Sequence, residues 1–522
     1  MVYDWTSITP SHDLNWIPCF DNFTCTRLKV PLDYGDTSRG TTAIAFVKFA
    51  APNTTEYTQN VLINQGGPGG SGVELVLTAG PTLSEALGSR HNIVGFDPRG
   101  VGESGPVIDC WPHHPEERAQ FEKLFYPDVS FASSTSLSTQ YYAAEIFGNA
   151  CTSSVGGPNG SASFLSTPAV AHDLFTYIKA EQVLAQKPVE EAKISYLAVS
   201  YGTVLGVTFA SLYPDNVGKM VLDGVVDASD YYNLGWSSNL YDTSKALDSF
   251  CKYCYRGGAS NCSFWGPSAK NISSRLDLLL AGLKNHPIPI PTSQGCGIPL
   301  MATYSDLKEY VLSAMYTPLS QFPELADVLS GLEQGNISAY VSAVTDGNLP
   351  ANPCNDGSGK NGTTDVNTLI KCIDGYAGNQ FEDLSQYRNY VDNLTAQSSF
   401  FGEVWPNNAG TVMCRSFNGT PPSSGRLPGM WNALNRTAFP IIFVTPEIDP
   451  VAPKRGAYKM SSVFPGSVVL VQASVGHTAI ASPSSCLLEN VKRYFDGQVP
   501  AENTTCKPDV LPFQGTPLLS FM

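Results

Sequence analysis

The chain has 522 residues, of which 42% are hydrophobic and 15% are charged, and its formal net charge is −15 at pH 7. This composition excludes a disordered protein, and no apolar run approaches the roughly 18–20 residues that a membrane-spanning helix needs. The excess of acidic residues, without any cluster of lysine and arginine, argues against nucleic acid or an anionic membrane as a partner.

Thirteen cysteines and eleven Asn-x-Ser/Thr sequons together predict a secreted, glycosylated protein with disulfide bonds. The opening segment "MVYDWTSITP" has no apolar core, so we expect a mature chain whose signal peptide was cleaved or is absent from this sequence. The sequon asparagines are Asn22, Asn53, Asn159, Asn261, Asn271, Asn336, Asn361, Asn393, Asn418, Asn435 and Asn503.

The odd number of cysteines leaves at least one thiol unpaired or paired outside the chain. The seven cysteines between residues 251 and 414 have no readable connectivity. Cys251-x-x-Cys254 raises zinc as an alternative, but no second cysteine or histidine pair follows at ligand spacing, so we expect no metal and no cofactor. Three disulfides are predicted: Cys19–Cys25, Cys110–Cys151 and Cys486–Cys506.

The first 228 residues alternate strand and helix signals, which predicts βαβ units and a mostly parallel, buried sheet. Two strands rich in β-branched residues, "TCTRLKVPLDY" and "TTAIAFVKFAA", come first. "NVLINQ" then runs into the glycine-rich "GGPGGSG", and "HNIVGF" runs into "DPRGVGESG". A helical stretch, "STPAVAHDLFTYIKAEQVL", precedes "AVSYG" and the strand "VGKMVLDGVVD".

The pattern changes at residues 229–435, where helical stretches such as "SSRLDLLLAGLKN" dominate. Within them, residues 352–364 are predicted to form an exposed loop because glycine, asparagine and other turn formers gather there. Strand, strand and helix return in "FPIIFVTPEIDPVAP", "GSVVLVQASVGHTA" and "CLLENVKRYFDG". We therefore predict one α/β core, formed by residues 1–228 and 436–522, with a mainly helical cap inserted at 229–435.

The segment "AVSYG", residues 198–202, lies between a strand and a helix and nearly matches the G-x-S-x-G motif of a nucleophile elbow. Such a turn lifts the serine hydroxyl above the end of the sheet and needs small residues on either side, a need that Gly202 meets. Ala198 puts a methyl group where glycine is usual, which crowds the turn without forbidding it. Taken alone, the segment fits an ordinary strand-to-helix turn equally well.

A serine nucleophile needs a base that accepts its proton and an acid that orients the base. At an elbow of this kind the acid and then the histidine follow the serine, each in a loop after a strand. His286 lies inside the helical insertion, where a surface role fits better, whereas His477 directly follows the strand "SVVLVQASVG". Asp449 follows the strand "IIFVTPEI" in the turn "DPVAP". The predicted catalytic residues are therefore Ser200, Asp449 and His477.

An acyl-transfer enzyme also stabilises an oxyanion with backbone N–H groups. The glycine-rich segment at residues 66–72 follows a strand where such a loop is expected, and glycine allows the backbone to turn its amides inward. The N–H group of Tyr201, next to the nucleophile, would be a second donor. A phosphate-binding loop is the alternative, but the segment lacks the G-x-x-x-x-G-K-S/T pattern.

Four segments resemble the tripeptidyl-aminopeptidase-like branch of the α/β-hydrolases, peptidase family S33, which is related to the prolyl aminopeptidases. They are "NQGGPGGSG", "GFDPRGVGESG", "VSYGTVLGVTFASLYPDNVGKMVLDGVVD" and "DPVAP" with the later "VGHTA". The resemblance covers both ends of the chain, and the insertion between them carries little that matches. It implies an α/β-hydrolase fold, catalytic roles for Ser200, Asp449 and His477, and oxyanion donors at Gly67 and Tyr201.

Two residues depart from the family pattern. Ala198 replaces the first glycine of the elbow, and Gln65 stands where the family usually has proline, or histidine in the prolyl aminopeptidases. Neither change removes a catalytic group, but Gln65 lies beside the oxyanion loop. Asp97 and Arg99 are expected to brace a turn, and Asp223 ends a strand near the predicted site with its role left open.

The sequence favours a secreted serine hydrolase, and most of all an exopeptidase that releases residues or short peptides from free N-termini through an acyl-enzyme. An esterase, lactonase or other acyl-transfer hydrolase of secondary metabolism is the alternative, because it uses the same tetrahedral intermediate. A protonated amine calls for carboxylates, but the insertion contains many, so the substrate-binding residues stay unassigned. The expected partners are a short peptide or small ester and N-linked glycans, with no nucleic acid and no membrane.

Overall fold

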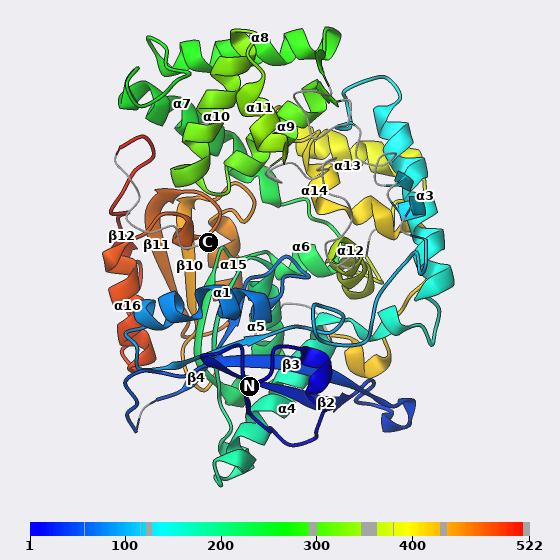
Figure 1. Cartoon of the computed structure of the whole chain (residues 1–522), viewed down its shortest axis with the longest axis vertical. Helices are drawn as coiled ribbons and strands as arrows, with labels where there is room; N and C mark the ends of the chain where they lie inside the picture. Colours follow the sequence, from blue (N-terminus) through cyan, green and yellow to red (C-terminus); the bar gives the residue numbers. More distant parts are fainter. Residues whose placement is uncertain are drawn as a thin grey trace.

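A ten-stranded sheet forms the lower half of the molecule in the computed structural model (Figure 1). The strand order is β1-β2-β3-β5-β4-β6-β7-β10-β11-β12, with antiparallel pairs from β1 to β5 and parallel pairs from β5 onward. The strands are β1 (Ile17–Cys19), β2 (Phe23–Pro31), β3 (Thr41–Phe49), β4 (Asn60–Asn64), β5 (Asn92–Phe96), β6 (Ile194–Val199), β7 (Val217–Asp223), β10 (Ile442–Ile448), β11 (Val468–Val475) and β12 (Thr505–Cys506). The predicted α/β class with a mostly parallel sheet is confirmed.

The structure describes residues 1–56, 58–114, 116–118, 120–121, 128–291, 300–345, 363–378, 380–427 and 436–514. The exposed loop predicted at residues 352–364 falls almost entirely outside these ranges. So do the two cysteines Cys296 and Cys354 and the sequon residues Asn361 and Asn435.

Helices cover both faces of the sheet, which explains why its central strands are apolar at consecutive positions. Val61 and Ile63 of β4 pack on one side with α1 (Gly72–Ala86) and α16 (Ser485–Phe495). Leu62, between them, packs on the other side with α4 (Thr167–Leu184), α5 (Tyr201–Leu212) and α15 (Arg455–Val463). Because strand side chains alternate between faces, every position of such a strand is buried.

A layer of helices lies above the sheet, in the upper half of Figure 1. β7 ends at Asp223 and β10 begins at Ile442, and the described chain between them supplies this layer together with a short antiparallel pair, β8 (Ile288–Ile290) and β9 (Leu300–Ala302). Within the described ranges, no helix is both long and apolar enough to cross a membrane. The helices are α6 (Ala228–Tyr232), α7 (Thr243–Gly257), α8 (Ala269–Asn285), α9 (Tyr304–Ala314), α10 (Pro318–Glu333), α11 (Ser338–Thr345), α12 (Thr363–Asp374), α13 (Leu384–Gln397) and α14 (Trp405–Ala409).

One helix from the first part of the chain also packs in this layer. Helix α3 (Ser136–Ser154) lies against α13 and the 3₁₀ segment Thr411–Ser416 (Figure 1), and its Phe147 belongs to the same apolar cluster as the helices of the layer. The cluster continues onto Tyr201 and Val204 of α5, so the layer packs directly on the helix that follows the predicted nucleophile. The division at residue 229 did not anticipate the place of α3, because alternation of strand and helix does not say which surface a helix will cover.

All three predicted disulfides are present, and two more, Cys254–Cys262 and Cys372–Cys414, form within the described part of the insertion. Cys251 is buried and is the free cysteine among the described residues. Cys251 and Cys254 therefore do not act together as ligands, because the second of them is bonded to Cys262.

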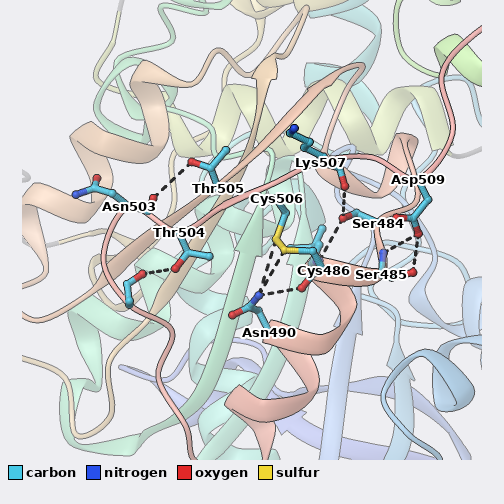
Figure 2. The surroundings of a disulfide bond; sticks show 12 residues. Ser484, Ser485, Cys486, Asn490, Asn503, Thr504, Thr505, Cys506, Lys507 and Asp509 are labelled. Atoms are coloured by element: carbon cyan, nitrogen blue, oxygen red, sulfur yellow. Dashed lines mark hydrogen bonds between the residues drawn. A yellow bond between two sulfur atoms is a disulfide. The ribbon is translucent and has the colours of Figure 1, made fainter.

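Figure 2 shows how one disulfide fixes the end of the sheet. Cys486, in the first turn of α16, is bonded to Cys506 of the edge strand β12, and the Ser484 hydroxyl donates a hydrogen bond of 2.7 Å to the carbonyl of Lys507. Asn503, a sequon residue just before β12, is exposed and points away from the disulfide. The edge strand is thereby held by a covalent bond and a helix cap, which limits pairing with another chain.

Candidate active site

The turn at Ser200 is strained in the way that a nucleophile elbow requires. Ser200 has φ 55° and ψ −129°, a region that residues other than glycine rarely adopt. Its N–H group donates to the carbonyl of Asp223 at 3.0 Å, and its own carbonyl accepts from the N–H group of Thr203 at 2.8 Å. An ordinary strand-to-helix turn needs no such conformation, so the backbone favours the elbow over that alternative.

Gly202 explains why Ala198 is tolerated in the elbow. A methyl group on Gly202 would lie 2.6 Å from Oδ1 of Asn64 and 2.9 Å from Cβ of Ala198. The extra methyl group of Ala198 therefore occupies the space that Gly202 leaves free. Position 202 must stay glycine because a side chain there would also meet Asn64, whereas position 198 has room for the methyl group.

The glycine-rich loop packs against the nucleophile turn. A Cβ atom on Gly66 would lie 2.6 Å from the carbonyl oxygen of Val199 and 2.9 Å from the nitrogen of Tyr201, and the φ angle of Gly66 is +87°. The next residue, Gly67, has φ +110°. Both the close approach and the positive φ demand glycine. The predicted oxyanion donors, the N–H groups of Gly67 and Tyr201, thus belong to two segments that lie side by side.

Gln65, the second departure from the family pattern, serves the loop itself. Its Nε2 atom donates to the carbonyl of Ser71 at 3.1 Å, which links the two ends of the glycine-rich segment. The Ser71 hydroxyl donates at 2.6 Å to Asp97, which also accepts N–H groups from Val73 and Glu103. Burial raises the pKa of Asp97 to about 6 in spite of these donors. The bracing role expected of Asp97 therefore extends to the oxyanion loop.

Asp449 and His477, the predicted acid and base, lie in contact. The Nδ1 atom of His477 is 3.0 Å from Oδ1 and 3.1 Å from Oδ2 of Asp449, whose side chain is completely buried. Asp449 also accepts the N–H groups of Val451, Ala452 and Thr478 at 2.8–3.0 Å. The turn "DPVAP" thus supplies two of the donors that fix the carboxylate. With Nδ1 facing Asp449, Nε2 is the nitrogen left to accept a proton from a serine.

The charges around His477 set its basicity. Burial alone would lower the pKa of the imidazole, but the charge of Asp449, its hydrogen bond and the charge of Asp223 outweigh burial and leave the pKa raised. These charges would stabilise the imidazolium that the predicted base must form during serine attack.

Asp223 connects the nucleophile turn to the histidine loop. Its backbone carbonyl accepts from Ser200, while both carboxylate oxygens lie 2.9 Å from the N–H group of Ala479, two residues after His477. Burial, followed by the charge of Asp449, raises the pKa of Asp223 to about 6. The role that the sequence left open is thus a structural one at the site: Asp223 fixes the loop that carries the base.

The helical layer reaches the same histidine. The N–H group of His477 donates to the carbonyl of Tyr316 at 2.8 Å, and the two rings pack edge to face with centroids 5.1 Å apart. Tyr316 lies between α9 and α10, and its pKa is raised by burial and by the charges of Asp449 and Glu309. Glu309, on α9, is therefore near enough to Tyr316 for its charge to raise the pKa of the Tyr316 hydroxyl, as the charge of Asp449 does.

Glu309 is a half-buried carboxylate held by amides. Its Oε1 atom accepts from Asn407 at 3.0 Å and its Oε2 atom from Asn408 at 2.9 Å. Burial raises the pKa of Glu309 to about 7. Within the described part of the chain it forms no ion pair with lysine or arginine. The carboxylate of Glu309 is therefore held in a fixed orientation in which it could pair with an additional cation.

Comparison with known proteins gives these residues a context. A family model described as the alpha/beta hydrolase fold matches residues 59–250, and one described as TAP-like protein matches residues 398–506. The serine protease Hip1 of Mycobacterium tuberculosis is 26% identical over 516 residues, which cover 96% of this chain and 90% of that protein. The tripeptidyl aminopeptidase of Streptomyces lividans is 26% identical over 495 residues, covering 94% of this chain and 84% of that protein. The chain is a serine hydrolase with the α/β-hydrolase fold.

The resemblance to the tripeptidyl-aminopeptidase-like branch is confirmed by these matches. A third relative of the hydrolase, carboxylesterase B of Mycobacterium tuberculosis, is 24% identical over 500 residues, covering 93% of this chain and 86% of that protein. The two model matches leave most of the helical layer uncovered, which is the part that sequence motifs also left unassigned.

Sequence reasoning missed the residues that the helical layer brings to the site of the hydrolase. Tyr316 and Glu309 belong to no motif, and the contact of Tyr316 with His477 depends on how the layer packs over the sheet. His286 is exposed at the end of α8, in agreement with the surface role expected for it. The signal that a sequence could have given for Asp223 is its place at the last residue of a buried strand, where the other predicted site residues also lie.

Proposed function

We propose that the hydrolase is an exopeptidase that releases residues or short peptides from free N-termini, with Ser200 as nucleophile, His477 as base and Asp449 as acid. The names of the relatives, a serine protease and a tripeptidyl aminopeptidase, support peptide substrates. The observation that carries the proposal is Glu309, a carboxylate without an ion-pair partner among the described residues, on a helix that leads to the predicted base.

The geometry supports a two-step acyl transfer. Oγ of Ser200 attacks the scissile carbonyl carbon while Nε2 of His477 takes its proton, and the resulting oxyanion accepts hydrogen bonds from the N–H groups of Gly67 and Tyr201. The C–N bond then breaks, and His477 returns the proton to the departing amine. Water attacks the acyl-enzyme in the second step with the same base, which releases the N-terminal fragment and restores Ser200.

We propose Glu309 as the residue that binds the free α-amine of the substrate. A protonated amine that leaves water must be paired, because an unpaired buried cation is costly. The two asparagine amides hold the carboxylate of Glu309 in one orientation, and burial raises its pKa to about 7 although the charge of Lys308 acts in the opposite direction. An ammonium group would offset that penalty, so the free N-terminus and the charged carboxylate favour each other.

The test is a matched pair of short peptides that differ only in N-acetylation. We expect kcat/KM to fall by about 100-fold or more on acetylation, because the charge-assisted contact is lost and a half-buried carboxylate is left without its cation. Glu309→Gln should lower kcat/KM for the free peptide and leave the acetylated one nearly unchanged. Glu333→Gln is the control, since Glu333 is paired with Arg275 on the outer helices. Equal rates for the two peptides would contradict the exopeptidase proposal.

An esterase is the second candidate, and the similarity to carboxylesterase B favours it. This candidate predicts that simple p-nitrophenyl esters are hydrolysed faster than any member of a peptide library and that Glu309→Gln changes neither rate. The helical segment at residues 229–435 would then act as a cap that selects acyl groups rather than chain ends.

We also propose that the hydrolase is secreted and carries N-linked glycans. Five disulfides within the described residues fit an oxidising compartment. Of the eleven sequon asparagines, nine lie in the described residues, and all of these except the half-buried Asn271 are exposed. Enzymatic removal of N-glycans from the secreted protein should lower its mass, and an unchanged mass would contradict the glycan proposal.

A further inference from the structure

Helix α12 of the helical layer is linked to both segments that carry the predicted oxyanion donors, directly to one and through Thr167 to the other. On one side, Nδ2 of Asn367 donates to the carbonyl oxygen of Pro68, in the middle of the glycine-rich loop, at 2.6 Å. Pro68 directly follows Gly67, whose N–H group is a predicted donor. A side chain from the insertion therefore holds the peptide unit of Pro68 and Gly69, two units along the loop from the one that carries the predicted donor.

On the other side, α12 reaches the side chain of Tyr201 through a chain of hydrogen bonds. Asp374, the last residue of α12, accepts the N–H group of Thr167 at 2.7 Å, the Thr167 hydroxyl, and the hydroxyl of Tyr231 at 2.8 Å. Because the Thr167 hydroxyl donates to Asp374, it accepts from the Tyr201 hydroxyl, which lies 2.5 Å away. The carboxylate thereby caps the first turn of α4 and fixes the residue that follows the nucleophile.

The two contacts are set at a fixed separation by the helix itself. Asn367 and Asp374 are seven residues apart, so they lie on one face at a spacing of about 10 Å. Other residues of α12 tie the helix to its neighbours: Cys372 is bonded to Cys414, and Nζ of Lys371 donates to the carbonyl of Ala409 at 2.8 Å. Figure 1 places α12 beside α6, between the helical layer and the sheet.

We propose that Asn367 and Asp374 are positioning residues of the oxyanion hole, which α12 holds open from the side of the insertion. The proposal rests on the proposed donor roles of Gly67 and Tyr201. The glycine-rich loop has several positive φ angles and few side chains, so its own sequence supplies little rigidity. Hydrogen bonds from an anchored helix restrict it before the substrate arrives, and a preorganised hole needs no rearrangement in the transition state.

The first test removes the contact with the loop. Asn367→Ala should lower kcat for p-nitrophenyl acetate about tenfold and leave KM within about twofold, a smaller loss than the 10²–10³ that follows deletion of a direct donor. The Ki of phenylboronic acid, whose adduct with the serine places an oxygen in the hole, should rise by a similar factor. Gln397→Ala is the control, because it removes one side-chain bond to a backbone carbonyl within the same layer, that of Ser237.

This ester assay separates positioning from substrate binding. If Asn367 instead binds the peptide, Asn367→Ala raises KM for peptides and leaves kcat for p-nitrophenyl acetate unchanged, which overturns the proposal. If Ser200→Ala keeps its turnover, the proposed site has failed, and that result is distinct from a failure of α12. The assay needs no exopeptidase activity.

The second test uses Asp374. Burial raises the pKa of Asp374 to about 7, so its neutral form is accessible and asparagine is a close mimic. In Asp374→Asn the amide oxygen accepts the Thr167 N–H group. The amide nitrogen donates to the hydroxyls of Thr167 and Tyr231, which rotate and become acceptors. We expect kcat within about twofold of the parent for Asp374→Asn and about tenfold lower for Asp374→Ala. Equal kcat values for the two variants would overturn the role of Asp374, and if Asp374→Ala does not fold, Asn367→Ala still decides the proposal.

Discussion

Replacing Asp223 by asparagine should have opposite effects on two properties of this hydrolase. The loss of stability at high pH should become smaller, whereas the activity should fall. The carboxylate of Asp223 is 4% exposed, and burial together with the charge of Asp449 raises its pKa from 3.8 to about 6. The folded state therefore binds its proton more tightly than the unfolded state does. The contribution of this group to stability is fully present below pH 3.8 and is lost as the pH rises through about 6.

The size of that loss follows from the pKa difference. A rise of about two units corresponds to about 3 kcal/mol at pH 8, since each unit is worth about 1.4 kcal/mol. Asp223→Asn removes the titrating group, so the fall in unfolding free energy between pH 3.5 and pH 8 should be smaller by about that amount. Denaturant unfolding of both proteins at the two pH values measures the difference.

The activity of the same variant should fall, although its stability depends less on pH. The amide keeps one oxygen for the N–H groups of Ala479 and Ile480 but turns an NH₂ group toward Ala479, and it removes a charge that raises the pKa of His477. We expect a lower kcat and an acid limb of the pH–rate profile that moves to lower pH. An unchanged pH dependence of both stability and rate would refute the reasoning about Asp223.

Three further predictions concern the predicted catalytic residues and the elbow. Ser200→Ala should lower kcat by a factor on the order of 10⁴–10⁶ and leave the thermal unfolding midpoint unchanged; normal turnover by the folded variant would contradict the nucleophile assignment. Activity should fall at acid pH with a midpoint above pH 6.5, because His477 must be neutral to accept the serine proton and the pKa of His477 is raised. A kcat/KM profile that is flat down to pH 4 would argue against His477 as the base. Gly202→Ala should destabilise the protein by about 1–3 kcal/mol, because the new methyl group meets Asn64 and Ala198. Adding Ala198→Gly removes the second of these contacts and should recover part of the loss. Equal unfolding free energies for the single and double variants would count against the steric explanation.

The sheet and the segments that follow its strands could be predicted because their signals are local. A strand covered on both faces has a continuous apolar run, as in Val61, Leu62 and Ile63 of β4, and the residues that follow such strands meet at one edge. Ser200, Asp449 and His477 were chosen by this rule and by their order along the chain. The disulfides Cys19–Cys25 and Cys486–Cys506 were predicted for a similar reason, since few residues separate the partners.

The contribution of the helical layer could not be predicted because it depends on packing between distant parts of the chain. The periodicity of α9 gives its apolar face, but it does not say that Glu309 faces two asparagines almost 100 residues later. The bond from Asn367 to Pro68 joins residues that are 299 positions apart and carries no motif at either end. Contacts of this kind follow from the way the layer is placed on the sheet, which a local pattern does not encode.

These contacts bear on what the helical layer does. A lid that only screens substrates would touch the rim of the site and leave the reacting groups to the core. Here the backbone carbonyl of Tyr316 accepts the N–H group of His477, and the side chain of Asn367 donates to the loop that carries Gly67. Each of these bonds pairs a polar backbone group of the core with a partner from the layer, and a hydrogen bond of this kind contributes about 0.5–1.5 kcal/mol to stability. We therefore infer that the layer helps to orient the predicted base and the predicted oxyanion loop. Changes in the layer should then alter the rate on small substrates as well as the choice among large ones.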